Sequence, residues 1–114
     1  MALILIVDDD KLLCDGLALR IAGIGHQVSC AYTLADAQEK LRSQAVDVVY
    51  LDVLMPDGNG LEALQVIRNL PVPPEVIIMT GRGDADGAEL AINNGAWDYI
   101  EKPFSLNEMI LPLT

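Results

Sequence analysis

Four apolar stretches of this chain end at, or shortly before, side chains that could do chemistry. These groups are the carboxylates Asp8 and Asp9 after residues 3–7, Asp52 after 46–51, the Thr80 hydroxyl closing 75–80, and the Lys102 ammonium after 97–100. Short apolar runs of strand-forming residues indicate strands that are buried on both faces. In an open parallel sheet, ligands bind just outside the carboxyl ends of the strands. We therefore expect these side chains to converge at one edge of a sheet.

Each of these groups also has a purely structural interpretation. The run Asp8, Asp9 and Asp10 could cap a first helix, Asp52 could begin a turn, Thr80 could end a strand, and Lys102 could be a solvated charge. Three carboxylates at one sheet edge would, however, repel one another by several kcal/mol at an effective dielectric constant of about 20. We therefore expect a cation among them.

The expected cation is Mg²⁺. Neither the single histidine nor the two cysteines lie near enough in the predicted layout to suggest zinc or copper. Carboxylates, a carbonyl and waters suit Mg²⁺, which often completes its shell with a substrate phosphate. This predicts phosphoryl transfer to an aspartate nucleophile, Asp52, with Lys102 neutralising charge and Thr80 donating a hydrogen bond. The first strand is not followed by a GxxxxGK[ST] or GxGxxG loop, so a nucleotide is not the expected donor.

Helical patterns separate the strands. The helices are expected after Asp10, after the capping residue Thr33, from near Gly60 to before Pro71, over residues 88–94, and from 106 to 114, with a further short strand at 27–31. Strand and helix alternate five times, which predicts an α/β fold with a parallel sheet and helices on both faces. Residues 1–114 form one domain in this interpretation. The last helix looks curtailed, since Pro112 removes a helix donor, and we expect the chain to be part of a longer protein.

The composition narrows the class of protein. Hydrophobic residues make up 52% of 114 residues, enough for one core, and no apolar run approaches the ~20 residues of a membrane helix. Seventeen acidic residues against seven basic ones give a net charge of −10, which opposes direct binding to nucleic acid or anionic lipid. A cytoplasmic location is expected by elimination. Cys14 and Cys30 are interpreted as small core residues of a reducing compartment, neither a disulfide nor a metal pair.

Four motifs in order resemble the receiver domain of two-component response regulators. They are ILIVDDD at 4–10, YLDVLMPDGNG at 50–60, VIIMTG at 76–81 and DYIEKPF at 98–104, so the resemblance covers essentially the whole chain. It implies a flavodoxin-like (βα)5 doubly wound fold with a five-stranded parallel sheet in the order 2-1-3-4-5. The string WDYIEKPF most resembles receivers attached to AAA+ activators of the alternative sigma factor, sigma-54.

The resemblance also implies a role for each matching residue. Asp52 would accept a phosphoryl group from the phosphohistidine of a sensor histidine kinase. Asp9 would be the principal acidic Mg²⁺ ligand beside Asp52. Asp8 would act through a bound water or by contacting the residues that bind the ion. The Leu54 backbone carbonyl would be the third protein ligand. Thr80 and Lys102 would bind the phosphoryl oxygens, and Tyr99 would turn inward as the switch residue when Thr80 moves.

The expected output is a change in the face made by the last two helices and the fifth strand, through which receivers of this kind can also form homodimers. The domain would catalyse only its own phosphorylation and dephosphorylation, and control an attached transcriptional output. Two alternatives remain. An aspartate-nucleophile phosphatase of the haloacid dehalogenase type uses a D-x-D pair, but position 54 is Leu; a degenerate receiver used only for docking would usually have lost an acidic ligand or Lys102.

Overall fold

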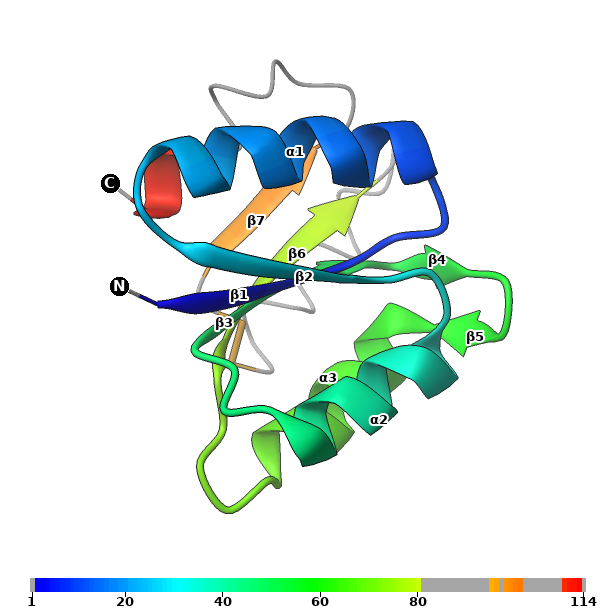
Figure 1. Ribbon diagram of the computed structural model, residues 1–114. Coiled ribbons are helices and arrows are strands. Elements are labelled where there is room, and N and C mark those ends of the chain that lie inside the picture. The colour runs from blue at the N-terminus through cyan, green and yellow to red at the C-terminus, as the bar shows by residue number, and fades with distance from the viewer. Residues whose placement is uncertain (1, 81–94, 97, 102–109, 114) are drawn as a thin grey trace.

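A computed structural model of the chain describes residues 2–80, 95–96, 98–101 and 110–113. Its central sheet has five parallel strands: β1 (Leu3–Val7), β2 (Gln27–Ala31), β3 (Val48–Asp52), β6 (Glu75–Thr80) and β7 (Asp98–Glu101). They lie in the order β2-β1-β3-β6-β7, which is the predicted order 2-1-3-4-5 (Figure 1). The flavodoxin-like doubly wound sheet is therefore confirmed.

Three helices lie on the two faces of this sheet. Helix α1 (Lys11–Gly23) covers one face, and α2 (Leu34–Ser43) and α3 (Gly60–Arg68) lie on the other (Figure 1). The helices expected at 88–94 and from 106 fall on residues outside the described part, except that Leu111–Leu113 forms a single 3-10 turn. Ile110 and Leu113, on either side of that turn's first residues, pack against the same core as α1.

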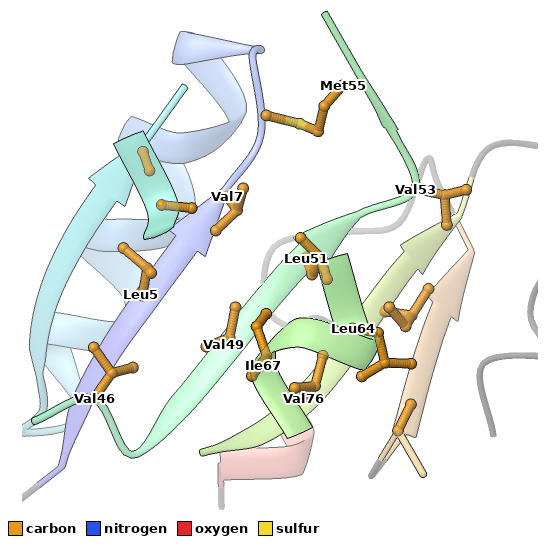
Figure 2. Close-up of a cluster of buried hydrophobic side chains, with 14 residues drawn as sticks. Leu5, Val7, Val46, Val49, Leu51, Val53, Met55, Leu64, Ile67 and Val76 are labelled. Carbon is orange, nitrogen blue, oxygen red and sulfur yellow. The ribbon is translucent and has the colours of Figure 1, made fainter. Parts of the chain in front are cut away.

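The central strands are buried on both faces, as their unbroken apolar runs predict. In β1, Leu5 and Val7 join the core beneath α2 and α3, whereas Ile4 and Ile6 join the core beneath α1. Figure 2 shows the first of these cores, in which Leu64 and Ile67 of α3 pack against the strands. Successive side chains of a strand point to opposite faces of the sheet, so neighbouring residues pack in different cores. A shift of one residue would move every side chain to the wrong core, and this fixes the register of the sheet.

Each helix begins at a residue whose side chain accepts a backbone hydrogen bond. Asp10 accepts from the Leu13 N–H (3.1 Å), Thr33 from Asp36 (3.1 Å), and Asn59 from Leu61 (2.8 Å). Such caps satisfy donors that the first helical turn leaves without an intrahelical partner. The predicted cap at Thr33 is confirmed.

The structure corrects three details of the predicted elements. The third strand begins at Val48, two residues later than predicted, and includes Asp52; the last begins at Asp98 and includes Glu101. A small antiparallel hairpin, β4 (Leu54–Met55) and β5 (Gly58–Asn59), occupies what the sequence indicated only as a turn. Two-residue strands carry no periodicity, so only their pairing reveals them.

Candidate functional site

The register of the sheet brings two aspartates side by side. Val7 of β1 is paired with Leu51 of β3, so the next residues, Asp8 and Asp52, leave adjacent strands at the same edge. Ligand atoms of the Asp8, Asp9 and Asp52 carboxylates all lie within 4.8 Å of one another. Asp8 is fully buried and Asp52 is 7% exposed, whereas Asp9 is exposed. The predicted convergence of these three carboxylates is confirmed.

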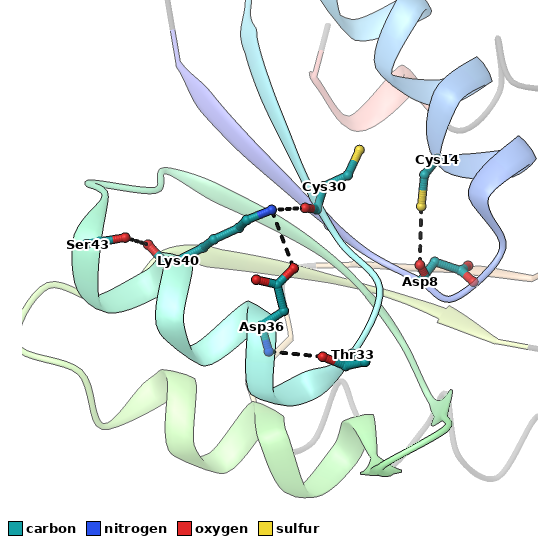
Figure 3. A network of polar contacts seen from close by, with 7 residues as sticks. All are labelled: Asp8, Cys14, Cys30, Thr33, Asp36, Lys40 and Ser43. Atoms are coloured by element: carbon teal, nitrogen blue, oxygen red, sulfur yellow. Dashed lines mark hydrogen bonds and ion pairs between the residues drawn. The ribbon is translucent and has the colours of Figure 1, made fainter.

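The three consecutive aspartates divide into two roles. Asp10 caps α1, which is the structural role considered for the whole run, and its N–H donates to Asp8 Oδ1 at 3.0 Å. Asp8 and Asp9 instead turn toward Asp52. Two hydrogen bonds hold the Asp8 backbone. The Asp8 N–H donates to the Ala31 carbonyl (3.1 Å). The Cys14 Sγ–H donates to the Asp8 carbonyl (3.4 Å; Figure 3).

The loop after Asp52 is held against the end of β3 by close backbone packing. The Leu54 N–H donates to Asp52 Oδ1 (3.4 Å), and the Gly60 N–H donates to the Val53 carbonyl (2.7 Å). A Cβ atom placed on Gly60 would lie 2.1 Å from the Asp52 carbonyl oxygen, far inside any allowed contact. Only glycine therefore permits α3 to begin so close to the end of β3. Gly60 was predicted only as a helix start; the sequence does not indicate this steric role.

Asp57 is a further site-positioning residue that the sequence analysis did not single out. Its carboxylate, in the turn between β4 and β5, accepts hydrogen bonds from the Leu34 N–H (2.8 Å) and the Ala35 N–H (3.0 Å) at the start of α2. These two bonds lower the pKa of Asp57 below its ordinary value of 3.8. The hairpin that follows Asp52 is thereby tied to the neighbouring helix α2.

The size and charge of the cluster fit a hard divalent cation. Oxygens on opposite corners of a Mg²⁺ octahedron are about 4.2 Å apart, twice the Mg–O distance of about 2.1 Å. The carboxylate separations of up to 4.8 Å are close to that span, so modest movement or one bridging water suffices. At 4.8 Å two carboxylates repel by about 3.5 kcal/mol at an effective dielectric constant of ~20. A bound cation would turn this repulsion into attraction, and the cluster can hold a metal ion.

Other predicted site residues are described only in part. Thr80 is the last residue of β6, next to Met79, which is paired with Asp52, so its backbone lies at the same sheet edge. The backbone of Tyr99 lies within β7. The side chains of Thr80 and Tyr99, and the whole of Lys102, lie outside the described residues. Leu54 lies two residues after Asp52, at the start of β4, and its side chain is exposed. Its carbonyl stays a predicted ligand.

Fold and site together define a class: a doubly wound parallel sheet with an acidic, cation-sized cluster at the carboxyl ends of its central strands. Residues 4–113 match the family described as the response regulator receiver domain. The chain belongs to that family, and the resemblance drawn from the four motifs is confirmed.

Individual relatives agree with this assignment. The chain is 38% identical, over 93% of its length, to the transcriptional regulatory protein PmrA of Pectobacterium parmentieri, and spans about half (48%) of that protein. Among solved structures, NtrX from Brucella abortus superposes with a TM-score of 0.91 at 32% identity over 98% of this chain and 25% of that one. A response regulator from Chloroflexus aurantiacus gives 0.90 at 28% identity over 98% and 93%.

The described residues contain no helix that is both long and apolar enough to cross a membrane.

Proposed function

We propose that the chain is a phospho-acceptor switch in which Asp52 receives a phosphoryl group from the phosphohistidine of a cognate sensor histidine kinase. The observation that carries this proposal is the buried Asp52 carboxylate, at the end of the central strand and within 4.8 Å of two other carboxylates. A buried carboxylate among like charges needs a cation, and a cation beside a phosphoryl group is what transfer to an aspartate requires.

The chain's own residues would then have distinct tasks. Asp9, Asp52 and the Leu54 carbonyl would hold Mg²⁺, with Asp8 acting directly or through water; the ion supplies charge neutralisation for the transferring oxygens. Asp52 would attack phosphorus in line, and the leaving nitrogen would remain with the kinase histidine. Lys102 and Thr80 would bind the phosphoryl oxygens, each by a charge-assisted hydrogen bond of about 1.5–3 kcal/mol.

The proposed output is a shift of the face formed by β7 and the helices expected at 88–94 and 106–114, with Tyr99 turning inward. Moving a two-state equilibrium from 1:99 to 99:1 needs about 5.5 kcal/mol, which two or three such hydrogen bonds supply. This face is also the proposed homodimer contact. We further propose a cytoplasmic protein without direct nucleic-acid contacts, whose output is an attached transcriptional domain of the sigma-54 activator type. It is not an enzyme beyond its own phosphorylation and dephosphorylation.

The test is labelling of the chain by acetyl phosphate with Mg²⁺. We expect one phosphoryl group per chain, no labelling of Asp52→Asn, and unchanged labelling of Asp15→Asn, which removes an exposed carboxylate on α1. Labelling of a folded Asp52→Asn chain would refute the acceptor assignment. Steady turnover of a generic phosphate ester would favour the phosphatase alternative, and failure to bind beryllofluoride with Mg²⁺ would favour a docking-only receiver.

A further inference from the structure

An apolar cavity of about 120 Å³ lies between α2 and α3, on the face of the sheet opposite α1. Figure 1 shows these two helices side by side over that face. Most of the lining residues are apolar: Leu34, Ala37 and Leu41 of α2, Leu51 of β3, Ala63, Val66 and Ile67 of α3, and Leu70 after it. The lining includes none of the three clustered aspartates, so the cavity is a separate feature of the molecule.

The cavity has a closed inner side and an open outer side. Leu51 and Ile67, both labelled in Figure 2, are buried and close the inner side. Val66 lines the cavity as well, but its side chain is 52% exposed, so the space reaches solvent there. Ala37 and Ala63 contribute only one methyl group each to the facing sides of the two helices. Protein interiors normally fill such space with larger side chains, so this one is available to a ligand.

The polar residues of the lining lie on α2. Gln38 and Arg42 are both exposed and four positions apart, which places them on the same side of the helix. Among the described residues that line the cavity, Arg42 alone carries a charge. Its guanidinium pairs with Glu39 at 3.6 Å, but these side chains are 68% and 75% exposed, and such ion pairs contribute little. Arg42 can therefore exchange that partner for an anion bound at the cavity.

We propose that this cavity binds a small aromatic carboxylate, with its ring between α2 and α3 and its carboxylate on Arg42 and Gln38. An apolar cavity of about 150 Å³ in another protein holds a benzene molecule, so the present volume suits a single ring. Ligand pockets are typically apolar with a few polar groups that orient the ligand. The planar guanidinium can donate two parallel hydrogen bonds to a carboxylate, and the Gln38 amide can donate another.

The charge of the chain favours this one position for an anion. The net charge is −10, with only seven lysines and arginines in the whole sequence, so most of the surface repels a carboxylate. The cavity combines one of these few cations with an apolar space of the size of a ring. Because Asp52 takes no part in it, this binding does not depend on the proposed phosphorylation.

The test is a titration of the unmodified chain, labelled with nitrogen-15, in which amide signals are followed by NMR. The probes are benzoate, the uncharged benzyl alcohol, and acetate, which has no ring. We expect benzoate to saturate with a Kd of about 1 mM, a reasonable affinity for so small a ligand, and to shift signals of α2, α3 and Leu51. Benzyl alcohol should bind the same residues at least about fivefold more weakly, since it lacks the charge-assisted hydrogen bonds. Acetate should not bind there, because it buries almost no apolar surface.

Three outcomes of this titration would overturn the proposal. Benzoate could fail to saturate or could shift signals elsewhere in the chain. Benzyl alcohol could bind as tightly as benzoate, which would remove the role of Arg42. Signals of the same residues could shift on concentrating the chain without any ligand, which would mean that a second copy covers the cavity.

Variants locate the ring and the carboxylate separately. Ala63→Leu should fill the cavity and abolish binding of both aromatic probes. Arg42→Gln should weaken benzoate at least about fivefold and leave benzyl alcohol unchanged. The matched control is Arg20→Gln on α1, which removes an exposed arginine away from the cavity and should change neither affinity.

Unchanged benzoate binding to a folded Ala63→Leu chain would show that the cavity is not the site. Equal losses in the two arginine variants would show that net charge, and not Arg42, holds the carboxylate. The comparison of the three probes needs no variant, so it decides the matter even if a substitution unfolds the protein.

Discussion

An aspartate lies at each end of strand β3, Asp47 just before its first residue and Asp52 as its last, and the two carboxylates have opposite surroundings. At the amino end, Asp47 is exposed, and its Oδ2 accepts a hydrogen bond from the Leu3 N–H at 2.8 Å. At the carboxyl end, Asp52 is 7% exposed and lies within 4.8 Å of the carboxylates of Asp8 and Asp9. Asp47 thus joins two strands, whereas Asp52 is held among like charges.

The difference separates a carboxylate that supports the fold from one that could bind a cation. A carboxylate that meets a backbone donor at an exposed position stabilises the folded chain. One that is buried with other carboxylates is destabilising unless a cation is bound, so its placement fits a metal-binding role better than a structural one. Each of the following predictions contrasts the two ends of β3 or the residues that support them.

The largest effect is expected at Gly60, which packs on the Asp52 carbonyl. Gly60→Ala places Cβ 2.1 Å from that oxygen, and the backbone must shift, so we expect a loss of about 3 kcal/mol in the free energy of unfolding. Urea unfolding measures it. The matched control is Gly23→Ala in α1, where a Cβ meets nothing within 4 Å; it should stabilise by about 0.5–1 kcal/mol. Equal effects of the two substitutions would contradict the packing described here.

Next in size is the effect of the acidic cluster on Mg²⁺ affinity. Asp9→Asn removes one clustered charge and should weaken Mg²⁺ binding about 10–100-fold, or roughly 1.4–2.7 kcal/mol, measured by titration calorimetry. Asp10→Asn is the control, because it removes a neighbouring charge but keeps a side-chain oxygen for the cap. A similar loss in both variants would mean that net charge, not the cluster, governs binding.

At the opposite end of the strand, the effect should be on stability alone. Asp47→Ala removes the acceptor of the Leu3 N–H, which is exposed and can turn to water, so we expect a cost of about 1 kcal/mol. Mg²⁺ affinity should stay within twofold of that of the unmodified chain. A large change in Mg²⁺ affinity would remove the distinction between the two ends.

The smallest effect is the pH dependence contributed by Asp57. The Leu34 and Ala35 N–H groups lower the pKa of Asp57 in the folded chain. The contribution of Asp57 to stability is therefore complete above its pKa in the unfolded chain, near 3.8, and is lost as the pH falls through its pKa in the folded chain. Asp57→Asn keeps an oxygen acceptor but cannot titrate. Its free energy of unfolding should therefore fall less steeply below about pH 4 than that of the unmodified chain. Parallel acid profiles would show that these hydrogen bonds do not form in solution.

The sheet could be predicted from the sequence because its central strands are buried on both faces. Such strands are unbroken apolar runs, and the run that ends at Asp52 and the run that ends at Asp8 are both of this kind. Their shared sheet edge then followed from parallel pairing. The family resemblance supplied the strand order, which apolar runs do not encode.

Other features depend on register and pairing that residue types do not reveal. Asp8, Asp9 and Asp10 are chemically identical, and only the backbone at the start of α1 makes Asp10 the cap. That Cys14 and Cys30 pack in the same core follows only from the face of β2 on which Cys30 lies. Gly60 and Asp57 act through distances to other segments, which a pattern of residue types does not contain.

The most direct test of the central claim is to locate the phosphoryl group after reaction with acetyl phosphate and Mg²⁺. Asp47 and Asp52 share one tryptic peptide, residues 43–68, so fragmentation by mass spectrometry distinguishes the two ends of β3 within a single molecule. The account predicts one added phosphoryl group on Asp52 and none on Asp47. A phosphoryl group on Asp47, or no labelled carboxylate in this peptide of a chain that labels elsewhere, would contradict it.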